Sequence, residues 1–150
     1  MSLASTMLFA QDLHWVPVIE PTSMQMSAVL QIDGVEIGEE ALQLEIGFFD
    51  QDGVCRAAKL PKLKKGHYRY SPVINGVDGE TTTYTCRIWD HNTDSERTDL
   101  TFVQNEDDPL IWAGNGASYG SSSNLYVLHF VTTTTGFELP ITGYGEGTGK

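Results

Sequence analysis

Apolar and polar side chains alternate along several stretches of this chain. Residues 24–32 carry an apolar side chain at every second position, and residues 42–48 and 82–88 repeat the pattern with aliphatic, aromatic and threonine side chains. A period of two sends successive side chains to opposite faces of a strand. We therefore expect half-buried β-strands over these three stretches.

Turn-forming residues separate the runs. Asp33-Gly34 follows the first run, and residues 50–53 follow the second, after which residues 54–60 should return antiparallel. A loop is expected over residues 75–79. Further strands are predicted at Tyr68 and Tyr70, at Leu100 and Phe102, at 110–112, and at 125–131, the last as a central strand. No stretch carries the i, i+3, i+4, i+7 spacing and the caps of an amphipathic helix.

The expected fold is all-β. Eight or nine short strands separated by Gly, Asn, Asp and Pro turns predict an antiparallel two-sheet β-sandwich, of the immunoglobulin-like or jelly-roll-like type. A closed barrel is the alternative.

The 150 residues suffice for one domain with its own core. We expect the sandwich to occupy residues 11–142. Residues 1–10 resemble an expression leader or the end of a signal peptide, which is a hint of export. Residues 143–150, with glycine at every second position, are typical of a linker to a downstream region.

Charge narrows the range of partners. Twenty acidic and nine basic residues give a formal net charge of −11, which repels phosphate backbones and anionic lipid surfaces. No nucleic acid is expected as a partner. No apolar run approaches the length of a membrane span, so no direct membrane insertion is expected either.

Cys55 and Cys86 are the two cysteines. Their separation fits neither a zinc knuckle nor a CxxC redox motif. A single disulfide in an exported chain and two separate buried thiols both remain open.

Two short motifs match known signals but lack their context. Residues 116–120 spell G-x-S-x-G, the pattern of a hydrolase nucleophile elbow, which requires a helix after Ser118 and an acid followed by a histidine downstream. A Ser/Gly-rich segment follows instead, and no carboxylate lies between Ser118 and His129. Residues 139–143 match the L-P-x-T-G sortase signal without the hydrophobic segment and basic tail that complete it. We interpret residues 116–120 as a loop and residues 139–143 as the end of a strand entering a linker, and we expect no enzyme.

Asp90, Asn92 and Asp94 place oxygen donors at alternate positions between two expected strands. Hard donors spaced in this way can converge on Ca²⁺, which makes them a weak candidate metal site. The same residue types are common in tight turns, and a turn is the favoured interpretation. No other cofactor is predicted.

Four aromatic residues are candidates for stacking against a sugar ring: Trp89, Trp112, Tyr119 and Trp15. Trp89 has the opposite parity to Cys86 and Ile88, so its ring is predicted to face outward. The competing interpretation, which is favoured, is that these rings fill the core or plug its ends.

A structural role is predicted for Arg56. If residues 42–60 form a hairpin, Arg56 lies across or diagonal from Gly47, with Glu45 in reach. We expect Arg56 to contact Glu45 or backbone carbonyls on a sheet face, and we expect it to support folding and not ligand binding.

Several segments together resemble a β-sandwich module found in secreted and surface proteins of Bacteroidetes. The matching segments are His-Trp-Val-Pro at 14–17, the run 26–34, Glu-Ile-Gly-Phe-Phe at 45–49, Cys-Arg-Ala-Ala at 55–58, Cys-Arg-Ile-Trp-Asp at 86–90, and the stretches 120–128 and 143–149. The chain departs from that family because no second cysteine stands near Cys55.

The resemblance implies an extracellular or cell-surface setting, further domains downstream, and no established catalytic residues. The function expected is a non-catalytic module of a larger protein for spacing, adhesion, or recognition of a cell-surface glycan or protein. The alternative is a small polysaccharide-acting hydrolase, or an accessory carbohydrate-binding domain of one.

Overall fold

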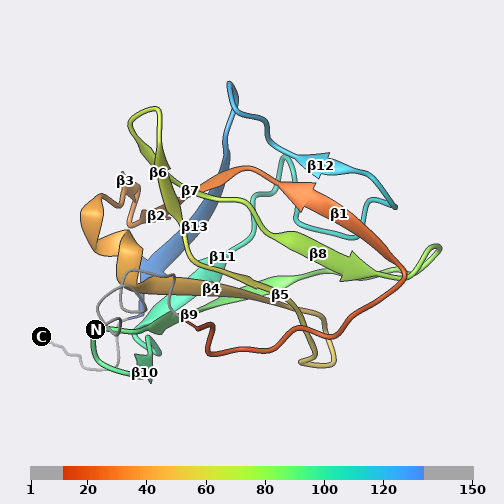
Figure 1. Ribbon diagram of the computed structural model, residues 1–150, viewed down its shortest axis with the longest axis horizontal. Coiled ribbons are helices and arrows are strands. Elements are labelled where there is room, and N and C mark those ends of the chain that lie inside the picture. Colours follow the sequence, from red (N-terminus) through yellow and green to blue (C-terminus); the bar gives the residue numbers. More distant parts are fainter. Residues whose placement is uncertain (1–11, 134–150) are drawn as a thin grey trace, which may run out of the picture.

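The computed structural model describes residues 12–133, which form an all-β fold of three sheets (Figure 1). The predicted all-β class is confirmed. The predicted leader at 1–10 and the predicted linker at 143–150 lie outside the described residues.

The strands fall into three groups. A three-stranded sheet has the order β12 (Ser118–Tyr119), β1 (Thr22–Met26), β8 (Val73–Gly76). A four-stranded sheet has the order β10 (Ser95–Glu96), β9 (Thr85–Asp90), β4 (Leu44–Phe49), β5 (Cys55–Lys59). The third sheet has the order β11 (Leu100–Val103), β13 (Tyr126–Thr132), β2 (Ala28–Ile32), β7 (His67–Tyr70), β6 (Lys62–Lys64), with β3 (Val35–Glu36) paired to β2. The short 3-10 helix η1 (Glu39–Gln43) precedes β4.

The alternating run at 24–32 serves two sheets. Ser27 divides it into β1 and β2, which belong to the three-stranded and the third sheet. At the division the Ser27 N–H donates to Tyr119 O at 2.8 Å, and Ser27 O accepts from Tyr126 N at 2.9 Å. Met26 and Ala28 on either side of Ser27 are both buried, so the alternation of apolar positions continues across it and the change of sheet leaves no mark on the sequence.

The predicted strand count and pairing are corrected. Residues 12–133 form thirteen strands where eight or nine were expected, because strands as short as β3, β10 and β12 arise in segments that resemble turns. The pairs β13–β2 and β1–β12 are parallel, whereas an antiparallel fold was expected. The loop expected over residues 75–79 begins inside β8, which ends at Gly76. The strand predicted at residues 110–112 is reduced to an isolated bridge between Ile111 and Thr83. The predicted central position of the last strand is confirmed, since β13 lies between β11 and β2.

One apolar core receives side chains from all three sheets. Its largest fully buried side chains are Tyr70, Tyr84, Phe48, Phe130, Met24, Leu30, Ile46, Ile74, Ile88, Leu110 and Leu128. Cys86 lies in this core, while Cys55, half-buried on the opposite face of the same sheet, remains a free thiol like Cys86. Of the two possibilities left open by the sequence, the structure therefore has two separate thiols and not a disulfide.

The β6–β7 hairpin ends the third sheet (Figure 1). All three residues of β6, Lys62, Leu63 and Lys64, are exposed. Arg69 on β7 is buried instead, and its guanidinium donates to Lys64 O at 3.0 Å and to Ser122 O at 2.9 Å. This arginine ties the hairpin to the loop that precedes β13.

Candidate functional site

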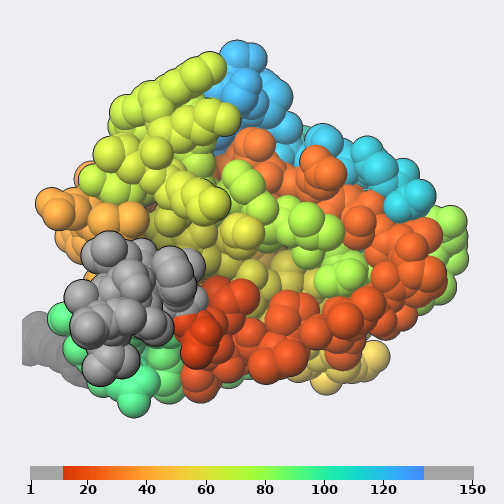
Figure 2. All heavy atoms as spheres, in the orientation of Figure 1, coloured from red at the N-terminus to blue at the C-terminus, as the bar shows by residue number. Residues whose placement is uncertain are grey.

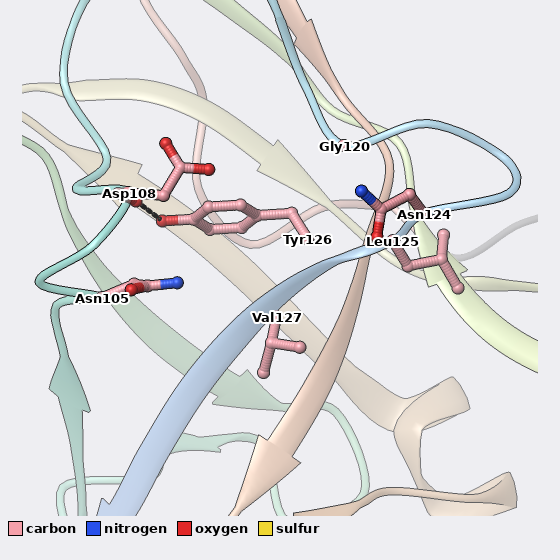
Figure 3. A pocket seen from close by; sticks show the side chains of 7 residues that line it. All are labelled: Asn105, Asp108, Gly120, Asn124, Leu125, Tyr126 and Val127. Carbon is pink, nitrogen blue, oxygen red and sulfur yellow. Dashed lines mark hydrogen bonds between the residues drawn. The ribbon is translucent and has the colours of Figure 1, made fainter.

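A cavity of about 210 Å³ opens between two loops and the start of β13 (Figure 3). Its lining residues are Asn105, Asp108, Gly120, Asn124, Leu125, Tyr126 and Val127. We call it the loop pocket.

The β11–β12 connection supplies the first wall. Asn105 Oδ1 accepts from Asp107 N at 3.0 Å, and Asn105 O accepts from Asp108 N at 3.2 Å, which folds the segment into a tight turn. The Tyr126 hydroxyl donates to Asp108 O at 2.7 Å, the dashed contact in Figure 3, and fastens this turn to β13. Burial raises the pKa of Tyr126, so the hydroxyl keeps the proton that it donates.

The β12–β13 connection supplies the second wall. Gly120 has φ +72°, a conformation that favours glycine, and a Cβ built there would lie 2.4 Å from Ser27 O. The chain then turns through residues 121–124, where Ser121 N donates to Asn124 O at 3.0 Å. This turn brings the side chain of Asn124 to the pocket.

Three residues that line the pocket carry polar side-chain groups with no hydrogen-bond partner among residues 12–133. Within residues 12–133, the Asp108 carboxylate, the Asn105 Nδ2 group and the Asn124 side-chain amide make no hydrogen bond. In Figure 3 the two asparagine side chains point toward Tyr126 from opposite sides. A carboxylate accepts hydrogen bonds and an amide both donates and accepts, so the lining can pair with donors and with acceptors.

The structure separates the four candidate stacking aromatics. Trp112 and Tyr119 are 8% and 7% exposed and belong to the core, which leaves no free ring face for a sugar. Trp15 and Trp89 meet outside the four-stranded sheet, with ring centroids 6.4 Å apart. The outward orientation predicted for Trp89 is confirmed, but the His14 ring stacks on it at 3.4 Å.

The candidate calcium residues form the turn between β9 and β10. Asp90 Oδ1 accepts from Asn92 N at 2.9 Å, and its Oδ2 lies 3.8 Å from Arg97. Asp94 occupies a left-handed conformation with φ +54°. No group of three or more His, Cys, Asp or Glu side chains among residues 12–133 is arranged to hold a metal ion.

The predicted contact between Arg56 and Glu45 does not form. A bulge between Phe48 and Phe49 makes Arg56 the extra residue of β5, because Ala57 pairs with Phe48 and Cys55 with Phe49. The bulge turns Arg56 away from Glu45 and toward β8. There it donates to Asn75 O at 3.0 Å, so the predicted contact with a backbone carbonyl is confirmed.

Arg56 instead joins two carboxylates at the junction of the three-stranded and four-stranded sheets. Its Nε lies 3.0 Å from Asp50 Oδ2, and its Nη2 lies 2.8 Å from Glu80 Oε1. Asn75 Nδ2 donates back to Arg56 O at 3.2 Å, so the two strands are linked in both directions. The hydrogen bonds from Arg56 lower the pKa of Glu80 to about 2 from its ordinary 4.5.

Acid should weaken the fold through Glu80. A folded-state pKa below the unfolded value gives stability that is present above pH 4.5 and is lost as the pH falls toward about 2. The lowered pKa corresponds to at most about 3 kcal/mol, and solvent screening of this partly exposed carboxylate reduces that contribution. We expect urea titrations between pH 7 and pH 2 to show this loss as a falling free energy of unfolding. In Glu80→Gln, the free energy of unfolding should fall less steeply with pH below pH 4.5. An equally steep pH dependence in the variant would contradict the assignment.

Ser118 and His129 lie in different sheets. Ser118 pairs with Gln25 in the three-stranded sheet, whereas His129 pairs with Val103 and Gln31 in the third sheet. Gly120 and a turn follow Ser118, and no helix begins there. The plain loop expected over residues 116–120 is corrected, because Ser118–Tyr119 form β12.

Sequence reasoning missed the loop pocket and the part played by Glu45. The run Asn-Glu-Asp-Asp-Pro at 105–109 was a visible turn signal, but nothing in the sequence places it against Asn124. Glu45 is fully buried and binds the N-terminal segment, described below.

Comparison with known proteins gives no relative from which to transfer a function. No family model, curated protein or solved structure matches the chain. The structure contains no helix, within residues 12–133, that is long and apolar enough to cross a membrane.

Proposed function

We propose that this chain is a non-catalytic recognition module of the cell surface or exterior, whose loop pocket binds a glycan. We further propose that its three sheets close as a sandwich of the Bacteroidetes surface type, with further domains downstream. The observation that carries the functional proposal is the set of unpartnered polar groups on Asn105, Asp108 and Asn124 around one cavity.

The chemistry of the lining favours sugar hydroxyls. Each hydroxyl can donate to the Asp108 carboxylate and accept from an asparagine amide, so neighbouring hydroxyls on one ring can satisfy both groups at once. A cavity of about 210 Å³ lies below the ~300–1,000 Å³ typical of drug-sized ligands. The pocket therefore suits a single sugar unit, such as the end or a branch of a chain.

A glycan array probed with the full chain tests the proposal. Asp108→Ala should weaken binding of any sugar detected about tenfold or more, since a hydrogen bond to a charged group contributes about 1.5–3 kcal/mol. Isothermal titration measures the loss, and the melting temperature should stay unchanged because the Asp108 side chain bonds to nothing within residues 12–133.

Asp107→Ala is the matched control. Asp107 is an exposed carboxylate of the same turn that does not line the pocket. Equal binding losses in the two variants, or no binding to any glycan, would count against the proposal. Release of reducing sugar from a polysaccharide would favour the hydrolase alternative, which needs a second carboxylate opposite the first.

A further inference from the structure

Residues 12–20, which we call the strap, run along the outer face of the four-stranded sheet before the chain enters β1 (Figure 1). They appear in red on the surface in Figure 2. The fully buried Glu45 carboxylate holds the strap, accepting from His14 N at 2.7 Å and from Trp15 N at 3.0 Å. His91 Nε2 lies 2.7 Å from the same carboxylate and supports it from the β9–β10 turn.

A hollow beside Glu45 receives the Trp15 side chain. Gly47 leaves the space, since a Cβ there would lie 2.6 Å from Trp15 Cε3. The Phe49 ring packs edge-to-face against the Trp15 indole, with 5.2 Å between the ring centroids. The Arg87 guanidinium lies 5.4 Å from the centroid of the Trp15 ring. The face thus combines a carboxylate for backbone N–H groups with a lined hollow for one aromatic side chain.

The strap is attached as a bound peptide would be. It belongs to no strand, and its remaining backbone contact to the sheet is Val18 N donating to Cys55 O at 3.0 Å. Between these attachments Val16 is 83% exposed, and Ile19 beyond them is 92% exposed. Pro17 has no N–H to join a ladder, and Pro21, where the chain bends just before β1, has none either.

We propose that this face is a peptide-binding site that also accepts the strap of a second copy of the chain, which gives a strap-exchanged dimer. Every copy carries the segment that fits the face, so the contacts of His14, Trp15 and Val18 are the same within one chain and between two. The exposed, proline-containing connection before β1 supplies the hinge. A short tether gives the strap an effective concentration on the order of mM, so exchange requires refolding near that concentration.

A disulfide trap uses the free thiol of Cys55. Val18→Cys in the full chain places a second thiol alongside it, because Val18 N and Cys55 O are hydrogen-bonded. We expect oxidation after refolding at about 1 mM to give a covalent dimer, and oxidation after refolding at a thousandfold lower concentration to give the cross-linked monomer. Peptide mapping should find the dimer joined between the introduced thiol and Cys55. A cross-link that stays within one chain at both concentrations would overturn the proposal.

Two further variants keep the test decisive. Adding Cys55→Ser to the trap variant should remove the mapped cross-link. Without any introduced thiol, sedimentation after concentrated refolding should show dimer for the unmodified chain and monomer for Trp15→Ala. If the unmodified chain stays monomeric while a labelled peptide of residues 12–20 binds Trp15→Ala, the face takes foreign segments and strap exchange is refuted.

Discussion

Replacing Arg56 with alanine should lower the free energy of unfolding by about 3–5 kcal/mol, the usual cost of removing one partner from a buried ion pair. The Arg56 side chain is 12% exposed, and the side chains of its partners Asp50 and Glu80 are 6% and 15% exposed. Alanine would leave both carboxylates facing each other without a cation and would also remove the bond to Asn75 O. The loss should appear in urea unfolding monitored by tryptophan fluorescence.

Arg97→Ala is the control for this prediction. Arg97 pairs with Asp99 at 2.8 Å, where Asp99 is 52% exposed, and reaches its second partner, Asp90, only at 3.8 Å. Exposed pairs contribute about 0–1 kcal/mol, so a small loss is expected. Arg56→Lys separates charge from geometry, because lysine keeps the charge but cannot bind two carboxylates and a carbonyl through a planar fork. An unfolding midpoint for Arg56→Ala equal to that of Arg97→Ala would disprove the assigned structural role.

Gly120→Ala should be comparably damaging for a different reason. A Cβ at this position would lie 2.4 Å from Ser27 O and 2.6 Å from Tyr126 N, and both neighbours are backbone atoms of a paired segment. Ser27 O also accepts the Tyr126 N–H, so relief of the clash would break the point where β1 passes into β2 beside β13. We expect a loss of about 3 kcal/mol or more, which combines overpacking with the cost of a left-handed backbone.

Gly116→Ala separates the two causes. Gly116 has φ +80°, close to the +72° of Gly120, but a Cβ there meets no atom within 4 Å. Its loss should be about 1–2 kcal/mol, the cost of the left-handed conformation alone. Thermal unfolding of both variants measures the difference, and similar melting temperatures would show that the backbone contact at Gly120 is unimportant.

Local alternation predicted much of this fold. The parity that places Cys86 and Ile88 in the core and Trp89 outside is confirmed, as is the hairpin of β4 and β5 around the turn at 50–53. These features depend on the two-residue period of a strand and on turn chemistry, and both are determined by residues that are close in sequence.

The features that the sequence concealed depend on distant contacts. One extra residue in β5 redirected Arg56, and a bulge leaves no local pattern because it changes pairing and not composition. The loop pocket joins segments whose side chains meet only after β13 pairs with β2. Glutamate is usually a surface residue, and the burial of Glu45 is accounted for by its contacts with the strap and with His91, none of which is local in sequence.

The lysines of β6 bear on how this protein behaves at high concentration. An edge strand offers unpaired backbone groups to which another molecule could add a strand. Lys62 and Lys64 are both exposed at this edge. If the β6 strand of a second molecule approached it, the ammonium groups of the two strands would repel each other and oppose their pairing. At β6 the third sheet thus ends in a charged border that discourages growth into fibrils, in a chain whose main secondary structure within residues 12–133 is the β-strand.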